Sequence, residues 1–285
     1  MSCQPQAVRS VECYRGSSDM RATAALLVLV LCLSATAPAA TLTVYSSEWG
    51  GASVTEIQIL LRNVQKTFYG TLARPPTNDV QVWRGHGDPL ITDRQSPRDP
   101  LRIYLDVNGR YWAQFSYQFA HELCHLVCDS DRFQTDTDQP HPWMWFQETL
   151  CETASLFTLR RMAESWKKNP PSPNWKNYAP HLRNYAQVRL DDSQRQLPTG
   201  MRLADWYAAN RFVLATNATL RPLNGVVANR LLSIFEANPR AWRAVQYLPV
   251  TQGTMTQYFQ AWLAQTPRQY TSVVRSIARE FQVAL

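Results

Sequence analysis

Short runs of alternating apolar and polar residues fill the first part of the chain, and helical spacing dominates the rest. Val80–Trp83 and Arg102–Val107 have the period of two that is typical of strands, and Thr41–Tyr45 is a shorter run of the same kind. Ser53 precedes apolar residues spaced three and four apart, namely Ile57, Leu60, Leu61 and Val64. We therefore expect a helix capped by Ser53 between the first two strands.

Loop and turn signals separate these runs. Residues 85–100 are rich in Gly, Asp and Pro and predict a loop. Asn108-Gly109 is a typical hairpin turn, so Tyr111–Phe115 is predicted to return as an edge strand.

Helical patterning governs the second half. His141 begins a segment that runs to about Lys168, where Pro-rich residues 169–173 end it. Further helices are predicted at 178–190, 203–215, 220–237, 255–264 and 269–283. Their large apolar side chains are interpreted as core: Trp206, Phe212, Leu231, Phe235, Trp242, Trp262 and Phe281. The fold class is α+β, a small mixed sheet leading through helices into a mostly helical part.

Residues 1–39 resemble a targeting segment. Met20-Arg21 precedes the apolar run Ala24 to Leu33 and an A-x-A site at Ala37-Pro38-Ala39, and Met20 is an alternative start. An uncleaved membrane anchor is the other interpretation, although the run is short for a bilayer. We expect a signal peptide and an exported protein, periplasmic or secreted, with no stable membrane span after cleavage.

Composition indicates a globular chain. Hydrophobic residues make up 45% of it, with 10 Trp and 12 Tyr, which argues against disorder. The net charge of +7 comes from scattered Lys and Arg, so we expect a solvated basic surface and no nucleic-acid partner. The predicted division is 40–130, an α+β subdomain, and 131–285, a helical subdomain. The sequence does not determine the oligomeric state.

The main chemical motif is the H-E-x-x-H pattern formed by His121, Glu122 and His125. Residues four apart share one helix face, so both imidazoles can bind one metal ion, and Glu122 can reach a metal-bound water. Neutral imidazole suits Zn²⁺. The pattern arises by chance in a chain of this length on the order of once in a hundred, so a second element is needed.

That second element follows 23 to 27 residues after the second histidine. Glu148 and Glu152 lie four apart in a helix-compatible segment that begins Trp145-Phe146. Two carboxylates on an apolar helix cost desolvation energy unless a cation receives them.

Together, the motifs resemble the gluzincin zinc metallopeptidases over about residues 121–155. The resemblance implies that His121, His125 and Glu148 bind zinc, that Glu122 is the general base, and that Glu152 orients His121 from outside the ligand set. It implies a peptide or protein substrate, cleaved by a zinc-activated water. Two departures are Thr149, where the family has Gly, and the absent G-x-M-x-N element, which favours an endopeptidase over an aminopeptidase.

Alternatives remain for the ligands. Asp131 occupies the position of the third ligand in metzincin-like sites, but Cys128 stands where those sites need Gly for a sharp turn. Cys128 is itself a rival ligand. If the two motif helices run antiparallel, Cys124 and Cys151 lie nearly in register, which favours a disulfide between them.

The mechanism also needs a donor for the oxyanion, and Tyr178, His181 and Tyr185 share one predicted helix face. An ordinary amphipathic face is the simpler explanation of those three residues. The alternative function is a non-catalytic zinc-binding or interaction protein that retains the fold. The intact Glu122 argues against that alternative.

Overall fold

The computed structural model describes residues 40–45, 48–87, 89–92, 99–128 and 142–285. The predicted signal peptide and the acidic residues around Asp131 lie outside these ranges. Residues from 39 onward group into one compact unit. In the part of the chain that the structure describes, no helix combines the length and apolarity that crossing a bilayer requires.

A four-stranded mixed sheet forms the first part of this unit, as expected. Strands β1 (Leu42–Val44), β2 (Val80–Arg84) and β4 (Leu101–Leu105) pair in parallel, and β3 (Leu90–Thr92) pairs antiparallel with β4 at the edge. The three parallel strands confirm the pattern-based prediction. Strand β3 lies within residues 85–100, which were predicted to be a loop. The prediction missed this strand because three residues are too few to show the alternation of apolar and polar positions.

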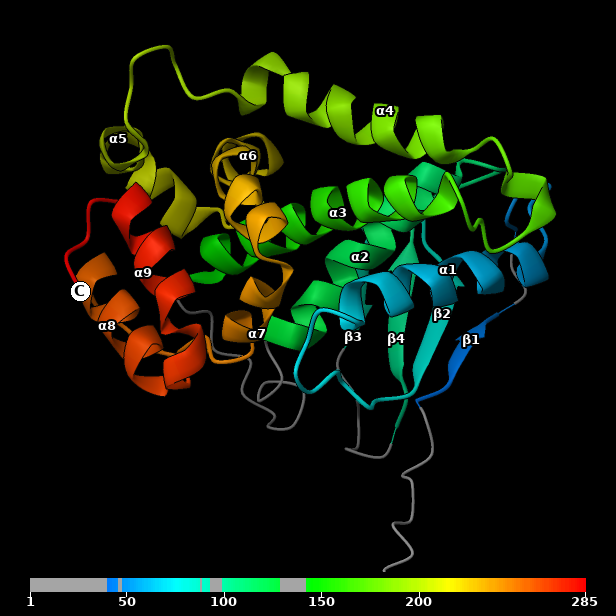
Figure 1. The fold of residues 1–285 in the computed structure, drawn as a ribbon, viewed down its shortest axis with the longest axis horizontal. Coiled ribbons are helices and arrows are strands. Elements are labelled where there is room, and N and C mark those ends of the chain that lie inside the picture. Colours follow the sequence, from blue (N-terminus) through cyan, green and yellow to red (C-terminus); the bar gives the residue numbers. More distant parts are fainter. Residues whose placement is uncertain (1–39, 46–47, 88, 93–98, 129–141) are drawn as a thin grey trace, which may run out of the picture. The chain divides into compact units, whose positions relative to one another are not determined.

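One face of the sheet is packed against helices. Leu101, Ile103 and Leu105 are buried while Arg102 between them is exposed, as a period of two requires. Helix α1 (Val54–Tyr69) connects β1 to β2 and lies across this face (Figure 1). The sheet therefore offers its apolar face to α1 and to the helix that follows β4.

Helix α1 begins at the predicted cap. The Ser53 hydroxyl accepts a hydrogen bond from the Glu56 backbone N–H at 3.1 Å, and the Glu56 carboxylate accepts one from the Ser53 N–H at 3.2 Å. This reciprocal capping box satisfies two amide groups that a helix start leaves without partners.

The predicted edge strand at Tyr111–Phe115 is wrong. Helix α2 (Trp112–Cys128) begins there instead, directly after the turn at Asn108-Gly109. Gly109 has φ +73°, and its N–H donates to the Trp49 carbonyl at 2.9 Å, so the turn aims the chain into a helix and forms no hairpin. A short apolar run is compatible with the period of a strand and with that of a helix. The apolar residues continue at helical spacing as far as Cys128, and this favours the helix.

Helix α3 (Met144–Trp166) lies at the centre of the helical part and confirms the predicted long segment. It packs against α1 and α2 on the sheet side, and against α4 (Ala179–Asp191) and α6 (Arg221–Ala237) on the other sides (Figure 1). Its buried residues occur all around its axis, which is typical of a helix enclosed by others. Every side chain on its inner turns is thus held by neighbours.

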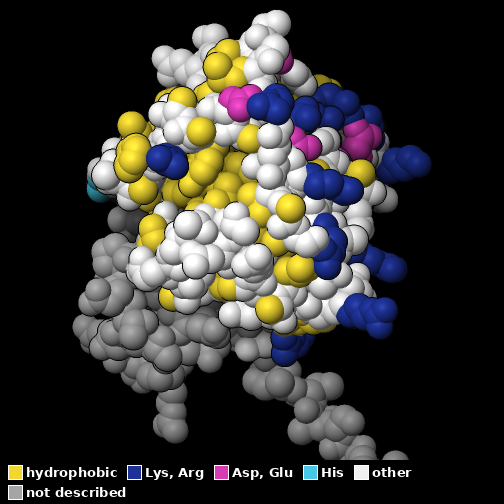
Figure 2. Space-filling view, turned by 90° about the vertical axis from the view of Figure 1, so that its left-hand side faces the viewer, with side chains coloured by type: hydrophobic (Ala, Val, Ile, Leu, Met, Phe, Trp, Pro, Cys, Tyr) yellow, Lys and Arg dark blue, Asp and Glu magenta, His cyan; other side chains and the backbone are white. Residues whose placement is uncertain are grey.

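The remaining helices complete the predicted helical part, namely α5 (Leu203–Thr216), α7 (Trp242–Val245), α8 (Met255–Gln265) and α9 (Thr271–Glu280). The predicted core residues are buried with one exception. Phe212 on α5 is 71% exposed, because α5 buries the face that carries Trp206 and Leu214. The side of the molecule where α5, α8 and α9 lie carries a central group of hydrophobic side chains, with Lys and Arg along one edge (Figure 2).

Candidate metal centre

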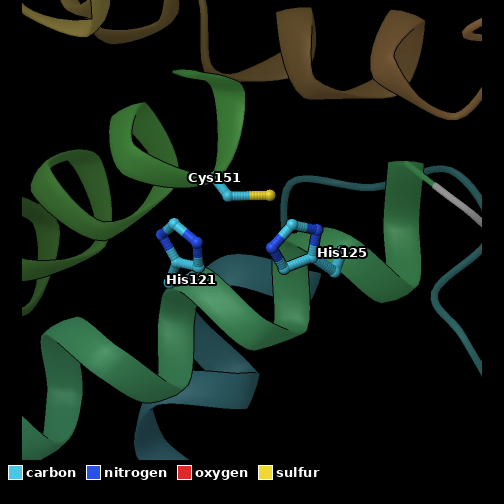
Figure 3. Close-up of side chains that lie close together, drawn as sticks. All are labelled: His121, His125 and Cys151. Carbon is cyan, nitrogen blue, oxygen red and sulfur yellow. The ribbon is translucent and has the colours of Figure 1, made fainter. Parts of the chain in front are cut away.

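Two histidines from α2 converge at the contact between α2 and α3. His121 and His125 are one helical turn apart, and their ring centroids are 5.0 Å apart (Figure 3). His121 is 6% exposed, and the side chain of His125 is largely buried. The predicted placement of both imidazoles on one helix face is therefore found.

Glu148 on α3 reaches both imidazoles. Its two carboxylate oxygens lie 3.1 Å from His121 Nε2 and 3.4 Å from His125 Nε2. Burial would raise the pKa of this carboxyl, but His125 and His121 outweigh it and lower the pKa to about 2. Two imidazoles and a carboxylate thus meet at one buried point, from residues 27 positions apart in the chain.

Glu122 is buried beside this group, at 2% exposure. Burial raises the pKa of its carboxyl above the usual value, although His121, His125 and Arg221 act in the opposite direction. A raised pKa makes the carboxylate a stronger base, which suits the role of a general base.

Glu152 lies behind His121, on the side away from Glu148. Its Oε2 is 3.8 Å from His121 Nδ1, and this ring nitrogen is buried without a hydrogen bond in the described part of the chain. Glu152 also accepts hydrogen bonds from the Tyr117 hydroxyl and the Arg195 guanidinium. Burial raises the pKa of Glu152, but Arg195 outweighs it and lowers the pKa, so the carboxylate stays ionised.

The sequence-based reasoning did not identify Tyr117 and Arg195. Tyr117 precedes His121 by four residues, so helical spacing could have placed it on the ligand face. Arg195 has no comparable signal, because it lies in a short 3-10 turn, Ser193–Arg195, that α6 holds in place. Its carbonyl accepts a hydrogen bond from Asn229 Nδ2 at 3.0 Å. At Gly225, an added Cβ would come within 2.7 Å of Arg195 Cγ, so glycine leaves room for the guanidinium arm.

Three cysteines crowd the same place, and the predicted Cys124–Cys151 disulfide is wrong. Cys124, Cys128 and Cys151 are buried, and no disulfide joins any two of them. The sulfur atoms of Cys124 and Cys128 are 3.7 Å apart, and all three sulfur atoms lie within 4.8 Å of one another. Burial raises the pKa values of Cys128 and Cys151 well above the usual thiol value, which favours the neutral form. The register argument thus predicted the proximity of these residues but not their covalent state.

Cys151 also faces the two histidines. Its sulfur and one ring nitrogen from each of His121 and His125 lie within 4.8 Å of one another, with the thiol pointing between the rings (Figure 3). Cys151 follows Glu148 by three residues on α3, so both side chains point toward α2. The described residues thus contain two overlapping groups that could hold a metal ion, the His pair with Cys151 and the three thiols.

The donor set fits a divalent transition metal. Two imidazoles with a carboxylate or a thiolate are ligands that zinc accepts, and tetrahedral sites are built from three or four such ligands. Among the described residues, Glu148 is the carboxylate that lies within 3.4 Å of both imidazoles. Asp131, the rival third ligand, lies outside those ranges.

The three candidate oxyanion donors, Tyr178, His181 and Tyr185, do not lie together at one place beside α2. The Tyr178 hydroxyl accepts a hydrogen bond from the Ala113 N–H at 3.4 Å, in the first turn of α2, and its ring lies 4.9 Å from the exposed His181 ring. Ala113 precedes His121 by eight residues, about 12 Å along a helix, so this pair is remote from the metal ligands. Tyr185 instead packs on Tyr117 with centroids 5.6 Å apart.

Comparisons with protein-family models, with curated proteins and with solved structures found no match for this chain. The interpretation of the site therefore depends on its residues and their geometry.

Proposed function

We propose that this protein is a zinc-dependent metallopeptidase whose metal ligands are His121, His125 and Glu148. The main support is the position of Glu148, whose two carboxylate oxygens lie 3.1 and 3.4 Å from the two imidazoles of the H-E-x-x-H helix. A largely enclosed carboxylate from a second helix, close to both rings, is the arrangement that a divalent cation would stabilise.

Zinc bound there would act as a Lewis acid that polarises a peptide carbonyl and acidifies a water molecule. Glu122 would take the proton of the attacking water and deliver it to the leaving amine. Glu152 would hold the His121 ring in orientation through Nδ1, while Tyr117 and Arg195 fix the Glu152 carboxylate. We assign endopeptidase action and an exported location to the same proposal, on the basis of the missing aminopeptidase element and the signal-like residues 1–39.

The decisive experiment combines metal analysis with a peptide-library cleavage assay on the wild type and Glu122→Gln. We expect about one zinc per chain in both proteins, and cleavage by the wild type only, since the amide cannot accept the proton. Glu164→Gln is the matched control, because Glu164 is exposed on α3 and pairs with Lys167 at 2.8 Å. It should retain both zinc and activity.

The alternative is a non-catalytic zinc-binding protein with a peptidase-like site. Stoichiometric zinc in a wild-type protein that cleaves no member of the library would contradict the peptidase proposal and favour this alternative. Absence of zinc from the wild type would contradict both.

A further inference from the structure

A cavity of about 200 Å³ opens beside the candidate metal centre. Tyr117 and Gln118, one turn before His121 on α2, form part of its wall, and Tyr185 and Arg189 contribute from α4. The wall also includes Arg195, which contacts Glu152, and Arg221, whose charge acts on Glu122 and Glu148. The cavity therefore adjoins the site where a peptide bond would react.

The charged groups in the wall are mainly cationic. Arg189, Arg195 and Arg221 face one carboxylate, Asp106, among the lining residues that the structure describes. The Asp106 carboxylate is 3.7 Å from the Arg84 guanidinium, and Arg195 is paired with Glu152. Arg189 thus adds a positive charge to the side of the cavity that α4 forms.

Arg189 is held in position without an acidic partner in the described ranges. Its guanidinium lies over the Tyr185 and Tyr117 rings, at 5.1 and 5.7 Å from their centroids, and donates to the Tyr185 hydroxyl at 3.0 Å. Cation–π stacking fixes the plane of a guanidinium and leaves its other N–H groups free to donate. An arginine oriented in this way loses little conformational entropy on binding a carboxylate.

We propose that this cavity binds a carboxylate of the peptide substrate, with Arg189 as the main specificity-determining residue. The proposal rests on the proposed peptidase function. The carboxylate belongs either to an acidic side chain near the cleaved bond or to the peptide's C-terminus. A bidentate contact with Arg189 accounts for a preference for either kind of carboxylate.

The test uses three synthetic peptides of otherwise equal sequence. One has an internal Glu and an amidated end, one has Gln and a free C-terminal carboxylate, and one has Gln and an amidated end. We expect one of the first two to exceed the third about tenfold in kcat/KM, since a charge-assisted pair in a partly enclosed site is worth about one factor of ten. Which of the two is preferred identifies the source of the carboxylate.

Two variants make the test specific. Arg189→Gln should abolish the preference, so that the variant cleaves the three peptides at rates equal to one another, and Arg189→Glu should reverse the preference toward a peptide with Lys at the same position. Arg183→Gln is the control on the same helix, since Arg183 pairs with Glu164 at the surface. It should leave the preference unchanged. Equal cleavage of the three peptides by the wild type, or an unchanged preference in Arg189→Gln, overturns the proposal.

A binding measurement separates this proposal from the proposed function. Fluorescence anisotropy of the same three peptides, labelled, with zinc-loaded Glu122→Gln requires no turnover. Tighter binding of a carboxylate peptide that Arg189→Gln removes supports the cavity assignment even if no peptide is cleaved. Cleavage without any carboxylate preference, in contrast, supports the peptidase and contradicts the cavity assignment.

Discussion

At the scale of single residues, Glu148 and Cys151 compete for one role. They lie one helical turn apart on α3, and both approach His121 and His125. The carboxylate is ionised, with its pKa lowered to about 2, whereas burial raises the pKa of the thiol. Metal binding by Cys151 would first require loss of its proton, so the ionised Glu148 is the more favourable candidate ligand.

The ligand assignment predicts different losses for two substitutions. Glu148→Ala should weaken zinc binding by more than about 100-fold, because removal of even an outer partner of a ligand costs about 10- to 100-fold. Cys151→Ala should change the affinity by less than about tenfold. Competition with a zinc chelator measures both values. A thiolate-to-metal charge-transfer band in the cobalt-substituted wild type, absent in Cys151→Ala, would show that Cys151 is the ligand instead.

Residue spacing along the sequence predicted five members of the candidate site but did not identify Tyr117 and Arg195. The four- and three-residue intervals of a helix place His121, Glu122 and His125 together, and also Glu148 with Glu152. Arg195 could not be found in this way, because only the packing of α6 brings its turn to Glu152. The approach of Cys151 depends on the rotation of α3 about its own axis, which spacing along one chain does not specify.

At the scale of elements, local signals succeeded where a cap or a long period was present. Ser53 and Glu56 identify the start of α1 without any tertiary contact. The five residues Tyr111–Phe115 were too short to distinguish a strand from the first turn of α2, and β3 was too short to detect. The exposure of Phe212 has a similar origin, since an apolar pattern does not reveal which helix face remains uncovered.

The cap on α1 leads to a stability prediction. Ser53→Ala removes the acceptor for the Glu56 N–H and should lower the free energy of unfolding by about 1 kcal/mol. Urea unfolding followed by circular dichroism measures the change. Ser233→Ala, on the exposed face of α6, is the control and should stay within about 0.5 kcal/mol of the wild type. An equal loss in both variants would mean that the capping box adds nothing specific.

At the scale of the whole molecule, the candidate metal centre joins the two parts of the compact unit. His121 and His125 come from the helix that follows the sheet, and Glu148 comes from the central helix of the helical part. A cation shared by these residues would connect α2 to α3 and favour the folded chain over the unfolded one. The boundary predicted near residue 130 falls between these two helices and remains a prediction.

Metal removal should therefore lower thermal stability. A chelator should reduce the unfolding midpoint of the zinc-loaded wild type, because free zinc at 100 times its dissociation constant stabilises the folded state by about 2.7 kcal/mol. Differential scanning calorimetry with and without the chelator measures the shift. The unfolding midpoint of Glu148→Ala should be the same with and without the chelator. If the midpoint of the wild type is also unchanged by the chelator, the protein has no bound metal that links the two helices.

The three thiols between α2 and α3 have a separate consequence. Cys124 and Cys151 have no exposed surface, and Cys128 has 8%. An alkylating reagent cannot reach sulfur atoms enclosed in this way until the two helices separate, so the intact fold protects them from modification. The rate of their alkylation therefore measures how often α2 and α3 separate and expose the interior of the protein to water.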